Sequence, residues 1–274
     1  MVERREGSIV HQEEVCVICN ESMGGGYYRM VLNAPRTART AVPGQFVHFR
    51  CSPSADPLLR RPFSVYDADE EAGTVSILYA VVGQGTALLP HFRDGDRTSI
   101  LGPLGTGFTI PEEPGNRVLI GGGVGIAPLL FLGKVLLEKK HRVKALLGMQ
   151  SAETAAIVQD FERAGIPVAV ATNDGSLGAC GHVTCLVDED SLEWNTDCRI
   201  YACGPRPMLQ AVQEWARSCG VETELSLEER MGCGVGVCLS CVCKVKVETE
   251  SGWEYQRVCV EGPVFSAREV ILDD

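Results

Sequence analysis

The chain has 274 residues, of which 45% are hydrophobic and 22% charged, and its formal net charge is −11. This composition is that of a soluble globular protein with room for two domains and a small third, and its acidic balance argues against nucleic acid and anionic membranes as partners. Thirteen cysteines follow a charged start, Met1 to Gly7, with no apolar signal segment after it, so a reducing cytoplasm is favoured over a secreted disulfide framework.

Residues 1–111 consist of short β-rich segments separated by turn residues, which predicts a small antiparallel β-barrel or sandwich. Residues 27–32 and 45–49 alternate between apolar and polar side chains, and Pro43-Gly44 is the predicted turn between them.

Two motifs in this segment indicate a pyrophosphate-containing cofactor. In Arg61-Pro62-Phe63-Ser64, Pro62 holds Arg61 extended so that its guanidinium can fork onto a pyrophosphate, with Phe63 and Ser64 on opposite faces. After the strand Leu78-Tyr79-Ala80, Gly85 and Thr86 begin an apolar stretch in which Thr86 is the predicted N-cap of a short helix. Each motif alone is also compatible with an ordinary strand end or glycine turn, but together they predict a flavin site.

From Arg117 the pattern changes to alternating strands and helices, after a polar linker at 111–116. This predicts a doubly wound parallel α/β sheet over residues 117–222. A turn between a strand at 118–120 and a helix at 126–140 would face a dinucleotide pyrophosphate. Its candidate binding residues are Gly121, Gly122, Gly123, Gly125 and Pro128. The segment 118–137 has the length of a membrane span, but these glycines, Pro128 and Lys134 argue against that interpretation.

Further strands are predicted at 143–148, 168–172 and 199–203, with a helix at 210–218. Cys203, Gly204 and Pro205 end the last strand at the sheet edge where such folds bind ligands. Cys203 is equally compatible with a place beside a nicotinamide and with plain burial. The strand ending at 148–151 has no arginine or lysine nearby to hold a 2′-phosphate, which favours NADH over NADPH.

The most specific motif lies at 228–243. Cys233, Cys238 and Cys241 have C-x4-C-x2-C spacing, and Cys259 follows a hairpin predicted at 242–248 and 253–258. This is the plant-type spacing of a 2Fe–2S cluster. The glycines of the loop are expected to adopt left-handed backbone conformations, namely Gly232, Gly234 and Gly236. Residues 223–274 would form the cluster-binding module.

Two alternatives remain for these cysteines. A structural zinc site is one, although zinc ribbons favour two C-x2-C knuckles. Within the cluster interpretation, Cys243 could replace Cys241 as a ligand, because alternation along a strand turns both side chains to the same face.

The segments R-P-F-S-V, G-Q-G-T, G-G-G-V-G-I-A-P-L and C-G-P-R-P-M together resemble the ferredoxin reductase family of flavoproteins. The tail from Glu229 to Lys244, with R-V-C-V-E-G-P-V-F, more narrowly resembles the electron transfer subunits of dihydroorotate dehydrogenase B. The resemblance spans nearly the whole chain. It implies contacts to FAD from Arg61 to Ser64, Leu78 to Ala80, Gly85 and Thr86, and a 2Fe–2S cluster on Cys233, Cys238, Cys241 and Cys259.

The resemblance also implies a partner, an FMN-containing catalytic subunit that oxidises dihydroorotate to orotate in pyrimidine biosynthesis, in a heterotetramer of two of each chain. Nicotinamide carries a hydride and a cluster carries single electrons, so a flavin between them predicts electron flow from the partner's FMN through cluster and FAD to NAD+. No histidine forms a catalytic constellation, and no catalytic residue is assigned.

Two other functions compete with this one. The chain could be the reductase subunit of a sulfide dehydrogenase or ferredoxin–NADP oxidoreductase complex, although the full set of four cysteines favours the pyrimidine branch. From a different class, it could be a zinc-stabilised interaction module without a redox role.

Overall fold

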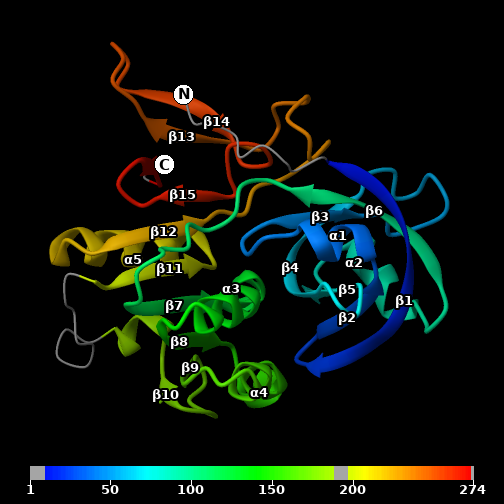
Figure 1. Ribbon diagram of the computed structural model, residues 1–274, viewed down its shortest axis with the longest axis horizontal. Helices are drawn as coiled ribbons and strands as arrows, with labels where there is room; N and C mark the ends of the chain where they lie inside the picture. Colours follow the sequence, from blue (N-terminus) through cyan, green and yellow to red (C-terminus); the bar gives the residue numbers. More distant parts are fainter. Residues whose placement is uncertain (1–9, 188–196, 273–274) are drawn as a thin grey trace.

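The computed structural model describes residues 10–187 and 197–272, so the charged start of the chain, Met1 to Gly7, lies outside the described residues. Three sheets organise the described chain: a closed barrel, a seven-stranded sheet and a small three-stranded sheet (Figure 1). Over these ranges, no helix is both long enough and apolar enough to cross a membrane.

The barrel closes with its strands in the order β1-β2-β5-β4-β3-β6, and all six pairings are antiparallel. The strands are β1 (His11–Gly24), β2 (Tyr27–Asn33), β3 (Phe46–Phe49), β4 (Arg61–Asp69), β5 (Thr74–Ala80) and β6 (Arg97–Leu104). Alternate side chains fill its interior; Val47 and Phe49 of β3, for example, are fully buried there. The predicted antiparallel barrel is confirmed.

Short helices connect strands of the barrel, namely α1 (Pro35–Thr40), α2 (Gln84–Leu88) and the 3-10 turn η1 (Leu89–His91). The prediction of a simple turn between β2 and β3 was incomplete, because α1 precedes the turn at Gly44, whose φ is +95°. The backbone N–H groups of Arg36 and Thr37, in the first turn of α1, donate to the Glu13 carboxylate at 2.9 Å each. A carboxylate at a helix N-terminus is stabilising, and here it comes from a distant strand.

The large sheet has the strand order β10-β9-β8-β7-β11-β12-β15, parallel throughout except for β15, which pairs antiparallel with β12. The strands are β7 (Asn116–Gly122), β8 (Arg142–Met149), β9 (Val168–Thr172), β10 (Ala179–Cys180), β11 (Arg199–Cys203), β12 (Glu222–Ser226) and β15 (Val264–Ser266). The helices and 3-10 turns between them are η2 (Gly123–Ile126), α3 (Ala127–Glu138), η3 (Ala152–Thr154), α4 (Ala155–Arg163), η4 (Val183–Leu186) and α5 (Arg206–Cys219). The predicted helix at 210–218 therefore begins four residues too late.

Helices cover both faces of this sheet, as a doubly wound fold requires. Leu119 and Leu147 belong to the core shared with α3 and α4, whereas Ile120 and Leu146, their neighbours along β7 and β8, belong to the core shared with α5. Because successive residues of a strand point to opposite faces, α3 and α4 lie on one side and α5 on the other.

The C-terminal segment forms the third sheet, in the order β14-β13-β16, from β13 (Val242–Lys246), β14 (Trp253–Arg257) and β16 (Val270–Ile271). β13 and β14 are the predicted hairpin, and they pair antiparallel. The segment also supplies β15 to the large sheet, which anchors the hairpin beside α5 and β12 (Figure 1).

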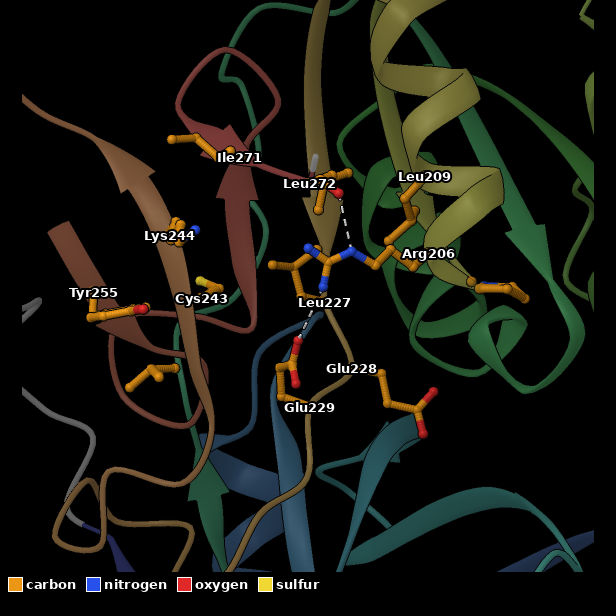
Figure 2. A pocket seen from close by; sticks show the side chains of 13 residues that line it. Arg206, Leu209, Leu227, Glu228, Glu229, Cys243, Lys244, Tyr255, Ile271 and Leu272 are labelled. Atoms are coloured by element: carbon orange, nitrogen blue, oxygen red, sulfur yellow. Dashed lines mark hydrogen bonds and ion pairs between the residues drawn. The ribbon is translucent and has the colours of Figure 1, made fainter. Parts of the chain in front are cut away.

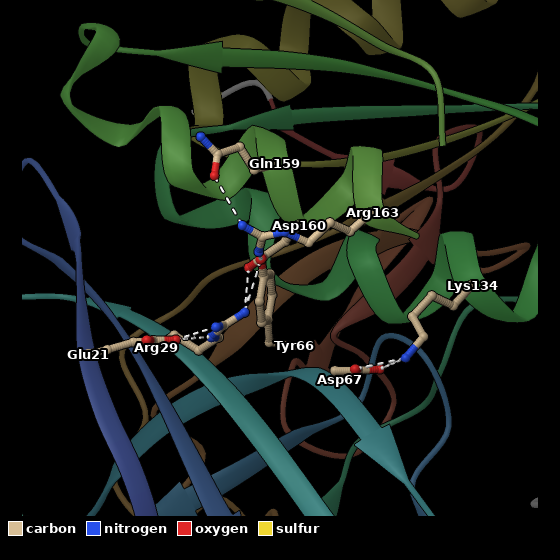
Figure 3. A network of polar contacts seen from close by, with 8 residues as sticks. All are labelled: Glu21, Arg29, Tyr66, Asp67, Lys134, Gln159, Asp160 and Arg163. Carbon is tan, nitrogen blue, oxygen red and sulfur yellow. Dashed lines mark hydrogen bonds and ion pairs between the residues drawn. The ribbon is translucent and has the colours of Figure 1, made fainter. Parts of the chain in front are cut away.

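A polar network joins the barrel to the α3–α4 face of the sheet (Figure 3). Both carboxylate oxygens of Asp160, in α4, accept from Nη1 of Arg29 in β2, at 3.0 and 2.9 Å. The Tyr66 hydroxyl of β4 donates to Asp160 at 2.8 Å. Nη1 of Arg163 also donates to Asp160, at 2.8 Å. Only 4% of the Asp160 side chain is exposed. A second pair, Lys134 of α3 with Asp67 of β4, is more exposed.

Candidate functional site

A cavity of about 320 Å³ lies where the barrel meets the sheet, and it brings together residues from all three parts of the chain. The barrel contributes residues of β4, β5 and α2, namely Arg61, Pro62, Phe63, Ser64, Leu78, Tyr79, Ala80 and Thr86. The sheet contributes Gly125 and Cys203, and the cysteine-rich segment contributes Met231. Of the residues expected around a flavin, Gly85 alone does not line this cavity.

Gly85 instead makes room for Arg61. A Cβ on Gly85 would lie 2.8 Å from Nε of Arg61, so any larger residue here would displace this guanidinium. Nη1 of Arg61 donates to the Leu59 carbonyl at 2.7 Å, which fixes the side chain over the glycine turn.

Thr86 has a different role from the predicted one. Gly83 is the N-cap of α2, and Thr86 is its third helical residue. Oγ1 of Thr86 accepts from the N–H groups of Val82 and Gly83 at 2.9 and 3.0 Å. Thr86 therefore closes the turn by reaching back to it.

Cys203 is buried, and burial raises the pKa of its thiol to about 12. It pairs with Gly121 across β11 and β7. A Cβ on Gly125 would lie 2.5 Å from Cα of Gly204, so the two turns pack backbone to backbone. The two predicted turns thus share one edge of the sheet, as expected.

A second cavity, of about 450 Å³, opens at this edge on the other side of the glycine turn. Gly122, Gly123 and Pro205 line it, together with Gly148, Met149, Gln150, Asn173, His182 and Tyr27, among others. Gly121 and Pro128 do not line this cavity, and Pro128 is buried in the first turn of α3. None of its described lining residues is a lysine or an arginine.

Tyr27 in this cavity belongs to the barrel and was not anticipated. The β1–β2 hairpin reaches the sheet at Gly24, where a Cβ would lie 1.8 Å from the carbonyl oxygen of Glu153. The Gly24-Gly25-Gly26 sequence that precedes Tyr27 was the signal of a close backbone approach.

The four predicted cysteines form two pairs. The Cys233 and Cys238 side chains lie close enough to influence each other's ionisation, and so do those of Cys241 and Cys259. The described residues offer these pairs, and no group of three or more side chains suited to a single metal ion. Two sulfur ligands on each iron is the arrangement of a 2Fe–2S cluster.

The loop backbone concentrates donors on one sulfur. Sγ of Cys233 accepts from the N–H groups of Val235, Val237 and Cys238 at 3.4, 3.3 and 3.5 Å. Burial opposes ionisation of this thiol, but the backbone donors lower its pKa to about 6. Such donors favour a thiolate, the form that binds iron.

Left-handed residues shape this loop. Gly234 and Gly236 have φ of +70° and +81°, as predicted, but Gly232 does not have a positive φ. A Cβ on Gly232 would lie 3.3 Å from Sγ of Cys238, so its role is to leave room for that sulfur. Leu239, with φ of +55°, is left-handed without being glycine, and such strain is characteristic of functional sites.

Cys243, the alternative ligand, lines a separate pocket between the hairpin and α5 (Figure 2). The wall also includes Arg206, which donates to the Leu272 carbonyl at 3.1 Å, and Glu229. Burial, then the nearby Glu229 charge, raises the pKa of the Cys243 thiol to about 12. Burial raises the pKa of the Cys259 thiol to about 12 as well, so thiol acidity does not separate Cys243 from the four predicted ligands. What separates it is its place in this other pocket.

Two family models match the chain. Residues 228–271 match the iron-sulfur cluster binding domain of dihydroorotate dehydrogenase B, and residues 119–214 match the oxidoreductase NAD-binding domain. The first range contains both cysteine pairs.

Full-length relatives decide the family. The chain is 42% identical to the dihydroorotate dehydrogenase B (NAD(+)) electron transfer subunit of Geobacillus thermodenitrificans, over 96% of this chain and 100% of that one. The chain belongs to the family of dihydroorotate dehydrogenase B electron transfer subunits. The subunit of Bacillus velezensis is 43% identical over 92% of this chain and 96% of its own. As an electron transfer subunit, the chain is an oxidoreductase component that acts with a catalytic partner.

Solved structures agree with this placement. In a structure of the NADH-dependent reduced ferredoxin-NADP oxidoreductase, one chain is 31% identical and matches with a TM-score of 0.82 over 94% of this chain and 90% of its own. The ferredoxin NADP+ reductase of Neisseria gonorrhoeae, solved with bound FAD and NADP, matches with a TM-score of 0.65 over 76% of this chain and 92% of its own. At 19% identity, it shares the fold alone.

Proposed function

We propose that this electron transfer subunit connects NAD+ to an FMN-containing catalytic subunit that oxidises dihydroorotate to orotate, in a heterotetramer of two of each chain. The relatives at 42% identity carry dihydroorotate dehydrogenase B and NAD(+) in their names, which supports this substrate pair over the sulfide and ferredoxin alternatives. When bound, FAD exchanges a hydride with nicotinamide and single electrons with a 2Fe–2S cluster, which is why both carriers are needed in one chain.

The cavity between barrel and sheet fits a flavin. Its β4 wall offers the Ser64 hydroxyl beside Pro62, its β5 wall is apolar, and Arg61 lies at the α2 end where a pyrophosphate would be neutralised. We assign FAD binding to these residues together with Leu78, Tyr79, Ala80, Gly85 and Thr86.

The cysteine pairs fit a two-iron cluster. We assign Cys233 with Cys238 to one iron and Cys241 with Cys259 to the other, because the side chains already meet in these pairs. The N–H groups directed at Cys233 would stabilise negative charge on its sulfur. Arg257 supports the loop from behind, since its Nη1 donates to the Gly236 carbonyl at 3.1 Å.

The second cavity fits a nicotinamide dinucleotide. The turn from Gly121 to Gly125 lets a pyrophosphate approach the backbone, with Pro128 inside the helix start and Cys203, Gly204 and Pro205 alongside. Because its described lining lacks cationic side chains that would hold a 2′-phosphate, NAD(H) is preferred over NADP(H).

One observation carries the proposal: Met231, two residues before Cys233, lines the same cavity as Ser64 and Cys203. The cysteine loop, the barrel motif and the nucleotide-binding edge of the sheet therefore meet at a single cavity. A cofactor in that cavity would be in reach of the other two sites.

We further propose that the exposed side of the cysteine loop meets the catalytic subunit. Val237 and Leu239, on either side of Cys238, are 79% and 63% exposed. Large apolar side chains exposed together are characteristic of protein interfaces. A catalytic subunit seated here would bring its own cofactor close to the cluster.

The cofactor assignments correspond to a proposed division of the chain into three domains. Residues 1–111 would bind FAD, residues 117–222 would bind NAD, and residues 223–274 would bind the cluster.

The test is reconstitution with the catalytic subunit. The purified chain is mixed with that subunit, dihydroorotate and NAD+, and NADH formation is followed by its absorbance. We expect NADH only when both chains are present. NADH formation by the catalytic subunit alone, or no NADH with both cofactor-loaded chains, would contradict the proposal.

A further inference from the structure

His48 is the one histidine of β3, and the alternation of that strand turns it out of the barrel. Its neighbours Val47 and Phe49 are buried inside the barrel. His48 is nevertheless only 1% exposed. An outward side chain on a barrel strand is buried only if another part of the chain covers it, and here that part is the cysteine loop.

The imidazole packs directly on the loop backbone. A Cβ on Gly234 would lie 2.8 Å from Nδ1 and 3.1 Å from Cε1 of His48, so the left-handed Gly234 is the residue that admits the ring. The ring also lies beside the backbone of Cys233. The ring therefore holds the residue that begins the cysteine motif.

The other side of His48 faces the flavin-binding strand. His48 pairs with Pro62 across β3 and β4, and Phe46 stands edge-on to the ring at 6.5 Å between centroids. Both Pro62 and Phe46 line the barrel–sheet cavity. His48 thus lies between the wall of that cavity and Cys233.

The second ring nitrogen of His48, Nε2, is not explained by these contacts. Nε2 is buried and has no hydrogen-bond partner within residues 10–187 and 197–272. Buried polar atoms without partners are rare and call for an explanation. Nothing in the fold of the barrel itself requires a histidine here, because a hydrophobic residue of similar volume would fill the space.

We propose that His48 is a positioning residue for electron exchange between the flavin and the cluster. Its Nδ1 side fixes Cys233 through the loop backbone, and its ring sets the spacing between the loop and β4. This inference rests on the proposed cofactors, but it is independent of the identity of the catalytic partner. His48 takes part in no bond-making step.

Three substitutions separate the two ring nitrogens. His48→Phe keeps the volume and removes both nitrogens, His48→Asn keeps a polar atom near the position of Nδ1, and His48→Gln keeps one near Nε2. His141→Asn is the matched control, because His141 is also buried but bonds the Pro111 carbonyl and the Gly115 N–H at the linker.

The first readout uses the full chain loaded with flavin and iron and reduced by NADH, without the catalytic subunit. In His48→Phe we expect flavin bleaching at the wild-type rate, cluster reduction slower by about ten-fold, and a changed EPR spectrum of the reduced cluster. His48→Asn should restore the rate of cluster reduction and the EPR spectrum, and His48→Gln should restore neither. If His48→Phe contains no iron, His48→Asn decides: a wild-type rate with full iron supports the proposal, and a slow rate with full iron overturns it.

The second readout needs no cofactor. Amide hydrogen exchange of residues 232–239 in the iron-free chain should be faster in His48→Phe than in the wild type and the His141→Asn control. Wild-type exchange, EPR spectrum and cluster reduction in His48→Phe would overturn the proposal. A wild-type chain that takes up neither flavin nor iron would overturn the proposed function as well, which separates the two failures.

Discussion

The barrel meets its two neighbours in chemically different ways. Toward the nucleotide-binding sheet it adds a charged network to its apolar contacts, with Asp160 held by Arg29 and Tyr66, and Lys134 paired with Asp67. Toward the cysteine-rich segment it presents apolar side chains and backbone: Phe46 and Leu104 share a core with Cys241 and Cys259, and the Thr106 N–H donates to the Gly262 carbonyl at 2.6 Å.

The difference matches what each boundary must do. Hydride exchange needs a nicotinamide that enters, reacts and leaves, whereas single-electron exchange needs a permanently fixed cluster. A directional polar network sets an orientation, and a closely packed, mainly apolar boundary keeps a cluster loop in place. The four predictions below test whether the two boundaries can be damaged separately.

Cys238→Ser should have the largest effect, and on the cluster side alone. Loss of an iron ligand should reduce electron delivery to the catalytic subunit by about 100-fold or more, while NADH still reduces the flavin at nearly the wild-type rate. Stopped-flow absorbance separates the two steps. Cys243→Ser is the control and should retain iron. Loss of flavin reduction together with the cluster would mean that the cysteine loop is a structural support for the flavin cavity.

Asp160→Ala damages the other boundary. It removes the buried partner of Arg29, which keeps only its exposed pair with Glu21, and the acceptor of the Tyr66 hydroxyl. We expect a loss of about 2–3 kcal/mol in unfolding free energy. Asp67→Ala removes a more exposed partner and should cost about 1 kcal/mol or less. Urea denaturation measures both. Equal effects of the two substitutions would show that the Asp160 network has no special place in the boundary.

Val237→Asp tests the exposed side of the cysteine loop. A carboxylate at a buried apolar contact should weaken binding of the catalytic subunit by about ten-fold or more, as measured by calorimetry, with iron content unchanged. Ile18→Asp is the control, since Ile18 is also an exposed apolar residue but lies on β1 of the barrel. The interface lies elsewhere if Val237→Asp binds as tightly as the wild type.

Gln150→Arg should have the smallest effect. Gln150 lines the nucleotide cavity and accepts from Asn173 Nδ2 at 2.8 Å. A guanidinium there could pair with a 2′-phosphate, and we expect the preference for NADH over NADPH to fall by about ten-fold. Steady-state kinetics with both dinucleotides measures it, and Gln12→Arg on β1 controls for added charge. An unchanged preference would place the adenosine ribose elsewhere.

Local patterns in the sequence predicted the parts of the molecule that depend on local physics. The strands at 168–172 and 199–203 are mostly apolar, and the cysteine spacing reflects one tight loop. The features that were missed depend on distant contacts. The cap of α1 comes from Glu13, more than twenty positions earlier. Tyr27 reaches the nucleotide cavity only because the barrel hairpin touches the sheet.

The same reason explains Thr86 and His48. Thr86 has the chemistry of an N-cap, but Gly83 takes the capping position and the Thr86 hydroxyl reaches back from inside the helix. His48 is one polar residue in an apolar strand, and its environment is created by a loop nearly two hundred residues later. No spacing rule connects two such positions.

The most direct test of the account is an anaerobic titration of the isolated chain with NADH, combined with iron, zinc and flavin analysis and EPR spectroscopy. The account predicts one FAD and about two irons per chain, bleaching of the flavin, and an EPR signal from a reduced 2Fe–2S cluster. Zinc in place of iron, or a cluster that stays oxidised while the flavin is fully reduced at all NADH concentrations, would contradict it.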